Sequence, residues 1–366
     1  MVLMILIACI LFIVGLQAAI PYLLKPHIVF GVTIPEGHTE DSVLMTYKKR
    51  YSFFVMMTGI IAIITLLIFG LNNSSEESII LSGVASQLSV LLVSMGLYVY
   101  FHIRTTKRKK EQSWGANLKK VRIADLTSHS NDEMLPNYIF ALPMIITIGL
   151  IAYTATQYEA MPDLIPTHWG PNGQPDAFTE KNPFSVIALL LISFIMQGMM
   201  IGVNATTKKS GIRLNPAKRS SSKVQQLSFR KYTSYFLFLT SLATTILTSF
   251  LHITTIHEDI VSSVFMISMP FGFLFVILLA TVIYAFKVGQ GGARIPVEEE
   301  EPIEGVTDFD DDRYWKAGVF YINKEDPSIF VEKRFGIGWT INFGNPIGYL
   351  IIFVPLALIL IITAFL

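Results

Sequence analysis

The sequence predicts an all-α polytopic membrane protein with about eight transmembrane helices. Composition is the first reason: 52% of the 366 residues are hydrophobic and only 15% are charged, whereas soluble domains carry roughly 25% charged residues. Segmentation is the second, because apolar runs of about 20 residues, long enough to cross roughly 30 Å of hydrocarbon, recur along the chain. The lipid bilayer is therefore the first expected partner.

The apolar runs lie at 3–24, 51–71, 79–101, 137–156, 183–203, 232–252, 261–286 and 346–366. The first run is expected to be a retained helix rather than a signal peptide, because no Lys or Arg precedes it. Cys9, the only cysteine, is interpreted as a buried helix residue. A single cysteine excludes an intramolecular disulfide and a cysteine-rich metal site.

The spans and their connections predict five regions. They are an N-terminal three-span region with a basic loop (1–136), a two-span module with an outer loop at 156–182 (137–203), a basic loop and two-span hairpin (204–287), a cytoplasmic insert expected to be β-rich (288–345) and the last helix (346–366).

Charge along the chain predicts the orientation. Most cations of the connections lie in 102–136, in 204–231 and at Lys48–Arg50. Lys and Arg in short loops stay cytoplasmic, and an even number of spans then places both termini outside the cell. The expected location is the bacterial plasma membrane.

A faint internal repeat is the next feature. Lys49-Arg50-Tyr51 and Arg230-Lys231-Tyr232 open similar pairs of spans, and Pro136-Asn137-Tyr138 resembles Asn345-Pro346-Ile347. Two tandem four-helix repeats, as found in some transporters, would explain this pattern. The alternative is that basic and aromatic residues look alike at every membrane interface.

No Asp, Glu, Lys, Arg or His lies in the middle of a span, which counts against an ion-coupled carrier. His252 and Lys287 are expected at helix ends, where a polar group reaches the interface. Gln87 and Gln197 are the most polar residues within spans, and interhelical hydrogen bonds are their expected role. In a transporter they would instead line a central cavity with the threonines of the sixth span.

The outer loop 156–182 is dense in Pro and Gly and has no helical or strand period, so a rigid, turn-rich surface structure is expected. Trp169 and Phe178 suit the headgroup belt.

The loop carries a distinctive motif, made of Pro162, Asp163, Ile165, Pro166, His168, Trp169, Gly173, Pro175, Asp176 and Lys181. This motif resembles the bacterial membrane family that includes SdpI-type immunity and signalling proteins. The resemblance implies an immunity or signalling role for the loop.

Five of these residues form the candidate ligand site: Asp163, His168, Trp169, Asp176 and Lys181. Together they offer a peptide amine an imidazole and carboxylates. A metal site would need further histidines from the same membrane face, where His252 and His257 are available. The structural alternative is that both aspartates cap turns and His168 bonds a carbonyl group. No tight metal-ligand spacing occurs, so no metal and no cofactor is expected.

The insert 288–345 begins with glycines and two acidic runs, Glu298–Glu301 and Asp308–Asp312, which are expected to be solvated linker. Aromatic and β-branched residues between 314 and 343 then favour a hairpin-like unit. They resemble a recurrent uncharacterised module with the pattern W-K-x-G-x-F-Y-x-N, then D-P, then F-V-x-K-R-x-G-x-G. Trp315, Lys333 and Arg334 are candidates for docking a cytoplasmic protein. The alternative places Lys333 and Arg334 on anionic headgroups, with Trp339 and Phe343 in the interface.

These features favour a non-enzymatic integral membrane protein of sensor, immunity or envelope-protection type, whose outer loop contacts an extracellular peptide or envelope ligand. A transporter or flippase is one alternative, and a membrane metalloenzyme using His168, His252, His257 and Glu258 is the other. A net charge of +1 gives no reason to expect a nucleic-acid partner.

Overall fold

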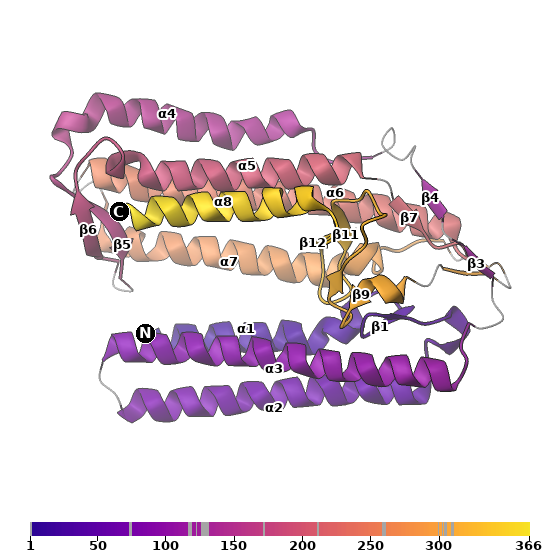
Figure 1. The fold of residues 1–366 in the computed structure, drawn as a ribbon. Coiled ribbons are helices and arrows are strands. Elements are labelled where there is room, and N and C mark those ends of the chain that lie inside the picture. The colour runs from indigo at the N-terminus through magenta and orange to yellow at the C-terminus, as the bar shows by residue number, and fades with distance from the viewer. Residues whose placement is uncertain are drawn as a thin grey trace.

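In a computed structural model, the chain is mostly helical (Figure 1). The structure describes residues 2–366 except 73–74, 116–118, 122, 126–131, 171–172, 211, 258–260, 299, 302, 304–305 and 309–310. Within this part of the chain, eight helices are long and apolar enough to cross a membrane. The predicted fold class is confirmed.

The helices are α1 (Val2–Leu23), α2 (Ser42–Asn72), α3 (Glu76–Glu111), α4 (Ala141–Gln157), α5 (Ala188–Lys209), α6 (Arg219–Ile256), α7 (Ser263–Lys287) and α8 (Pro346–Ala364). Four of them extend well beyond the predicted spans, because α2 and α6 begin earlier and α3 and α5 end later than the apolar runs. Lys and Arg are good helix formers, so basic segments continue a helix past the hydrocarbon.

The helices form two groups (Figure 1). In the first group α1, α2 and α3 pack against one another, and in the second α5 and α6 contact each other, with α4 packed on both, α8 on α5 and α7 on α6. The grouping is therefore three and five, and the four-and-four packing expected from tandem repeats is not found. The reason is that α4 lies against α5 and α6 instead of the three helices that precede it.

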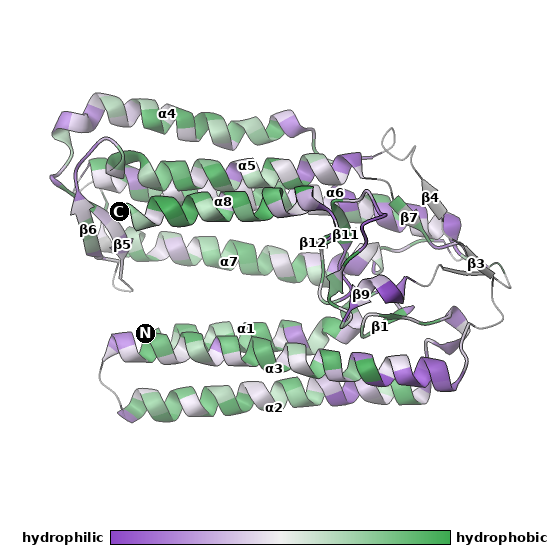
Figure 2. Cartoon of the chain, in the orientation of Figure 1, coloured by the Kyte–Doolittle hydropathy of each residue, from purple (hydrophilic) through white to green (hydrophobic). Residues whose placement is uncertain are grey.

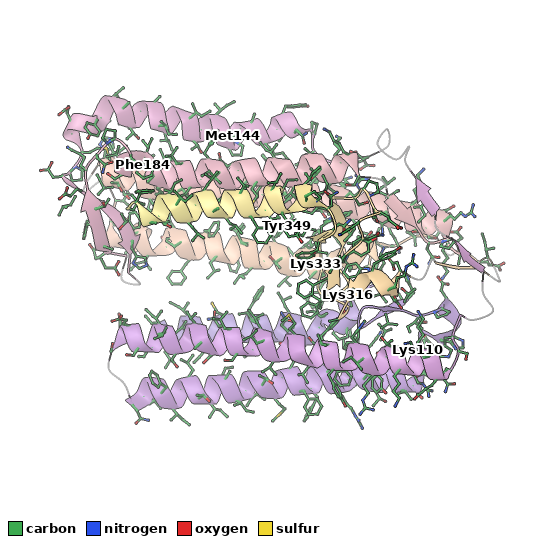
Figure 3. All side chains as sticks on the ribbon, in the orientation of Figure 1. Lys110, Met144, Phe184, Lys316, Lys333 and Tyr349 are labelled. Atoms are coloured by element: carbon green, nitrogen blue, oxygen red, sulfur yellow. The ribbon has the colours of Figure 1, made fainter. Side chains whose placement is uncertain are left out.

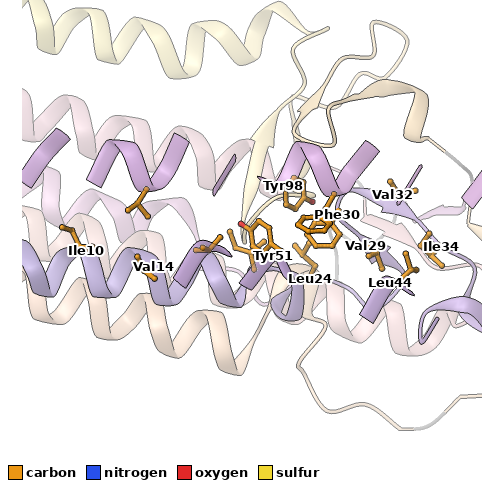
Figure 4. Close-up of a cluster of buried hydrophobic side chains, with 14 of the residues drawn as sticks. Ile10, Val14, Leu24, Val29, Phe30, Val32, Ile34, Leu44, Tyr51 and Tyr98 are labelled. Atoms are coloured by element: carbon orange, nitrogen blue, oxygen red, sulfur yellow. The ribbon is translucent and has the colours of Figure 1, made fainter. Parts of the chain in front are cut away.

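The first group has an aromatic core near one end (Figure 4). Phe30, from the loop after α1, stacks on Phe101 at 5.2 Å between ring centroids and meets Tyr51 and Tyr98 edge-on, each at 5.5 Å. Close packing along the helices depends on Gly59, because a Cβ there would lie 2.4 Å from the side chain of Val14. Cys9 is half-buried in α1 rather than fully buried.

The two ends of the molecule differ in character (Figures 1 and 2). Both chain ends lie near a β-hairpin made of β5 (Leu164–Trp169) and β6 (Pro175–Glu180); we call this the hairpin end. The opposite, basic end carries Lys107–Lys110, Lys208–Lys209 and Lys218, together with the remaining strands. Figure 2 shows the hydrophobic residues concentrated along the helices between these ends.

The strands of the basic end are short and form two-stranded units. They are β1 (Ile28–Val29) with β2 (Val32–Thr33), β3 (Lys119–Val121) with β8 (Val306–Asp308), β4 (Ile123–Asp125) with β7 (Ile212–Leu214), β9 (Trp315–Lys316) with β10 (Phe320–Tyr321), and β11 (Phe330–Glu332) with β12 (Trp339–Ile341). All pairs are antiparallel except β3 with β8. We call residues 311–345, which hold β9 to β12, the C-terminal module. The predicted hairpin-like unit is confirmed.

Candidate functional site

The outer loop forms an antiparallel hairpin, which the sequence did not predict. Leu164 pairs with Glu180 and Trp169 with Pro175, and the register shifts on both sides of His168. These irregularities interrupt the alternation of inward and outward side chains by which a strand is recognised in a sequence. The expectation of a loop without strands was therefore wrong, although the expectation of a rigid unit agrees with the hairpin.

The base of the hairpin is anchored to the second helix group. Ile165 is buried with Met161, Val186 and Ile256. Lys181 donates a hydrogen bond of 2.8 Å from Nζ to the carbonyl oxygen of Met161, and the same ammonium lies 5.5 Å from the ring centre of Tyr158. Lys181 thus acts mainly within the fold, which fixes where the hairpin projects.

Four of the five candidate ligand residues form two pairs of opposite charge or hydrogen-bonding character. A ring nitrogen of His168 is hydrogen-bonded to the carboxylate of Asp176, and the two side chains are 69% and 51% exposed. Lys181 Nζ lies 3.7 Å from the fully exposed carboxylate of Asp163, while Trp169 is half-buried. His168 therefore pairs with a carboxylate instead of the carbonyl group of the structural alternative.

The two other histidines of the candidate metal site are hydrogen-bonded to hydroxyl groups of α4. His252 is buried, and its Nε2 lies 2.6 Å from the hydroxyl of Thr154; His257 Nε2 lies 2.7 Å from the hydroxyl of Tyr153. The expectation that His252 reaches the interface is wrong, because its polar partner is inside the helix group. Glu258 lies outside the described residues, and no group of three potential metal ligands occurs among those the structure describes.

Polar residues of the spans link α4, α5 and α6. The amide of Gln197 donates to Thr147 Oγ1 at 2.8 Å and to Thr245 Oγ1 at 2.7 Å, which agrees with the expected interhelical role. Gln87 lies on α3, in the other helix group. A central cavity lined by both glutamines is thus not formed.

Arg334 holds the C-terminal module against the first helix group. Its guanidinium donates to Gly31 O at 2.5 Å, to Thr33 Oγ1 at 3.1 Å and to Asp312 Oδ1 at 2.6 Å. It also forms an ion pair with Asp311, and both side chains are less than 10% exposed. The carbonyl oxygen of Arg334 accepts a hydrogen bond from the hydroxyl of Tyr98 on α3.

Asp312 is the second centre of this contact. Its carboxylate accepts hydrogen bonds from the backbone and side chain of Thr33 and from Lys109 Nζ at 2.8 Å. Burial alone would raise the pKa of Asp312, but Arg334 and Lys109 lower it further than burial raises it, so the pKa lies well below its usual value. The carboxylate is thus charged at neutral pH.

Of the three residues expected to dock a partner at the surface of the module, two are buried and one is exposed. Trp315 and Arg334 are buried, with the guanidinium 5.1 Å from the Trp315 ring centre, and only Lys333 is exposed. The headgroup contact expected for Arg334 is wrong, because carboxylates of the same chain surround it. The expectation of solvated linker is likewise wrong for Asp311, which is buried.

A cavity of about 960 Å³ lies at the basic end, between the segments that the C-terminal module brings together. Its walls come from the loop after α1 (24–39), the end of α5 with Ser210, Ile212 and Asn215, the start of α6, the described residues between Gln290 and Glu300, and the module. Trp315, Lys333 and Arg334 all contribute to the lining, so the whole predicted docking set borders this space.

Sequence reasoning missed the network that joins Arg334 and Asp312 to the first helix group. Thr33 and Lys109 are separated from Asp312 by 279 and 203 positions, and no local pattern marks such a pairing. Arg230 was missed for a related reason: it was counted as a loop cation, yet it is fully buried in α6 and donates to the carbonyl oxygens of Thr207 and Ser210 at the end of α5.

Two segments of the chain match protein families without an assigned function. Residues 145–194, which cover most of α4, the hairpin and the start of α5, match a domain of unknown function (DUF1648). Residues 324–349, which cover the C-terminal module from Lys324 onward and the start of α8, match a family of unknown function (DUF5808). No curated protein and no solved structure matches the chain. The chain is therefore an integral membrane protein, with eight candidate spans in the part that the structure describes and two segments that match families of unknown function.

Proposed function

We propose that this chain is a non-enzymatic membrane protein of sensor or envelope-protection type, and that the β5–β6 hairpin contacts a cationic peptide. The observation that carries the proposal is the exposed acidic character of the hairpin region. Glu159, Asp163, Asp176 and Glu180 are all exposed in this region, and Lys181, the cation beside them, is tied to Met161. A cationic ligand is therefore attracted to this end of the molecule.

Two further features support a peptide as the ligand. The sheet contains only β5 and β6 among the described residues, so each strand has an edge to which an extended peptide can add main-chain hydrogen bonds. Leu164 and Phe178 are 57% and 51% exposed beside the acidic groups. Exposed apolar side chains next to carboxylates suit a ligand that is both cationic and amphipathic.

Peptide binding to the purified full chain in neutral-lipid nanodiscs tests the proposal. A cationic amphipathic peptide should bind, and a neutral peptide of the same hydrophobicity should bind more weakly. The double variant Asp176→Asn with Glu180→Gln should weaken binding roughly three- to tenfold, since each exposed charge contributes up to about 1 kcal/mol. Added salt should reduce the difference.

Glu77→Gln is the matched control, because Glu77 is exposed at the start of α3, outside the hairpin. This variant should bind like the natural chain. Equal binding of both peptides to every variant would overturn the proposal.

A second experiment, in cells, tests the protective role. Cells that lack the chain are exposed to membrane-active peptides, and their survival is measured. Complementation by the natural chain should restore survival, while His168→Ala should restore it only in part, because the variant no longer holds the Asp176 carboxylate in position. Unchanged survival on deletion would argue against a protective role.

A further inference from the structure

The C-terminal module is fixed at the end of a span. It runs directly into α8, whose first residue is Pro346. Gly348, in the first turn of α8, packs against β12, because a Cβ at this position would lie 3.2 Å from the side chain of Ile341. The ends of spans lie at the level of the lipid headgroups. The module therefore lies beside the headgroups, on the side predicted to be cytoplasmic.

One side of β10 and of the residues that follow it is apolar and exposed. Phe320 and Ile322 are 45% and 39% exposed, whereas Tyr321 and Asn323 are buried. Side chains alternate between the two faces of an extended segment, so this pattern places Phe320 and Ile322 on the outer side. Two large apolar side chains thus stay uncovered by the described chain, next to the start of a span.

Lysine side chains flank the apolar pair. Lys316 of β9 is the direct partner of Phe320 in the register of the hairpin, so the two side chains share one face. Lys316 and Lys324 are both exposed. Long lysine stems cover apolar surface while their ammonium groups reach the polar headgroups. Glu325 is exposed as well, so apolar contact rather than a surplus of charge distinguishes this face.

A ladder of aromatic rings joins this face to α8. Phe320 meets Phe343 edge-on at 5.5 Å between ring centroids, and Phe343 meets Tyr349 edge-on at 5.9 Å. Tyr349, which Figure 3 shows on α8 beside the module, stacks on Phe353 at 5.9 Å, and its hydroxyl donates to the carbonyl oxygen of Phe343 at 2.9 Å. Tyr349 and Phe353 are 39% and 51% exposed on a helix apolar enough to cross a membrane. The ladder therefore continues the lipid-facing surface of α8 out to Phe320.

We propose that this face, formed by Lys316, Phe320, Ile322 and Lys324, lies in the headgroup region of the bilayer, with Phe320 and Ile322 at its boundary with the acyl chains. Continuity with the lipid-facing surface of α8 carries the proposal. Lipid covers the two apolar side chains without any further partner, and aromatic rings are favoured at this level of the membrane. The bilayer surface, and not a cytoplasmic protein, is then the docking partner of this face of the module.

The depth of a fluorescent label in lipid nanodiscs tests the proposal. In the full chain with Cys9 replaced by Ser, Phe320→Cys and Ile322→Cys are labelled separately with an NBD group. The nanodiscs contain phosphatidylcholine and a lipid nitroxide, placed either near the headgroup or near the end of an acyl chain. Both labels should lose more fluorescence to the nitroxide near the headgroup than to the deep one, and little to aqueous iodide. Ile322→Cys leaves the ring ladder intact, so a result common to both positions does not come from loss of the Phe320 ring.

Two further positions calibrate the measurement. A label at Phe353→Cys, on the exposed side of α8, should respond most to the deep nitroxide. Lys110→Cys is the aqueous control, because Lys110 is exposed near the end of α3, apart from Tyr349 (Figure 3). It lies about 50 Å along the helix from Glu76, whereas the hydrocarbon is roughly 30 Å thick. Its label should respond to iodide and to neither nitroxide.

Either of two outcomes would overturn the proposal. Quenching by iodide at both module positions that is as strong as at Lys110 would show that the face lies in water. Protection of both positions from iodide and from both nitroxides would show that a second copy of the chain covers the face.

Discussion

Arg334 shows how one side chain can join distant parts of this chain. Its hydrogen bonds reach Gly31 and Thr33 in the loop after α1, and its charge is balanced by Asp311 and Asp312 of the module. A buried pair costs desolvation, so its net contribution to stability is small, but loss of one partner leaves an uncompensated charge in the interior.

Arg334→Met should therefore destabilise the docked module by about 3–5 kcal/mol, because Asp311 and Asp312 lose their shared counter-charge. Hydrogen exchange of the backbone over residues 315–343 measures the effect and should become faster. Arg313→Met is the control, since Arg313 is exposed beside the Tyr314 ring. Exchange as slow as in the natural chain would show that the ion pairs do not hold the module.

The pH dependence of docking follows from Asp312. Its pKa is lower in the folded chain than the usual 3.8, so the folded state favours the charged form. The contribution to stability is complete above the unfolded-state pKa and is lost as the pH falls through the folded-state pKa. Exchange of the module should hence be constant between about pH 5 and 8 after correction for intrinsic rates, and should accelerate below about pH 4.

Asp312→Asn removes this titration and should exchange faster at neutral pH, with less change on acidification. Acceleration already at pH near 6 would point to a different group, such as a histidine.

At the scale of elements, the β5–β6 hairpin depends on its turn as well as on its anchored base. Gly173 adopts a φ of +76°, and a Cβ at this position would lie 2.9 Å from the side chain of Ile267 on α7. The N–H of Gly173 donates to Gly170 O at 2.9 Å within the turn. Backbone conformation and close packing therefore both favour glycine here.

Gly173→Ala should loosen the hairpin by about 1–2 kcal/mol, because alanine is strained at positive φ and meets Ile267. Hydrogen exchange of β5 and β6 is the measurement. Gly149→Ala in α4 is the control, since nothing lies within 4 Å of a Cβ there. A hairpin that is equally protected in both variants would show that the turn tolerates a side chain.

At the scale of the whole molecule, the C-terminal module joins the two helix groups at the basic end. It contacts the first group through Arg334 and through Phe335, whose ring centre lies 4.6 Å from that of Tyr98 on α3. On the side of the second group, the ring centre of Trp339 lies 5.7 Å from that of Phe229 on α6. The side-chain amide of Gln290, after α7, donates one hydrogen bond to the backbone of Gly338 and accepts another from it. The chain enters the module from α7 and leaves it into α8.

The predicted orientation belongs to this scale too. In a chain with Cys9 replaced by Ser, Lys110→Cys should react with an impermeant thiol reagent only after the cells are opened, because cation-rich loops stay inside. Asp163→Cys, at the hairpin end, should react in intact cells. The reverse pattern would invert the topology and move the peptide site to the cytoplasm.

Hydropathy along the chain was enough to predict eight apolar helices, and the aromatic and β-branched residues of the insert predicted its hairpin-like unit. In the part of the chain that it describes, the structure confirms eight helices long and apolar enough to cross a membrane, and it confirms the hairpin-like unit. Span prediction succeeds because every backbone polar group in lipid must be satisfied within its own helix, so each span is specified by local sequence. The candidate pair of His168 and Asp176 was also accessible, since the two residues are only eight positions apart.

The grouping of three and five helices, the burial of Arg334 and the joining of Lys209 and Lys333 at one cavity were decided by tertiary structure alone. Helices in lipid are nearly equally apolar on every side, so hydropathy does not say which of them will pack together. Charged residues outside the bilayer find partners hundreds of positions away, as Asp312 finds Thr33. Only the folded chain shows which charged groups lie close enough to pair.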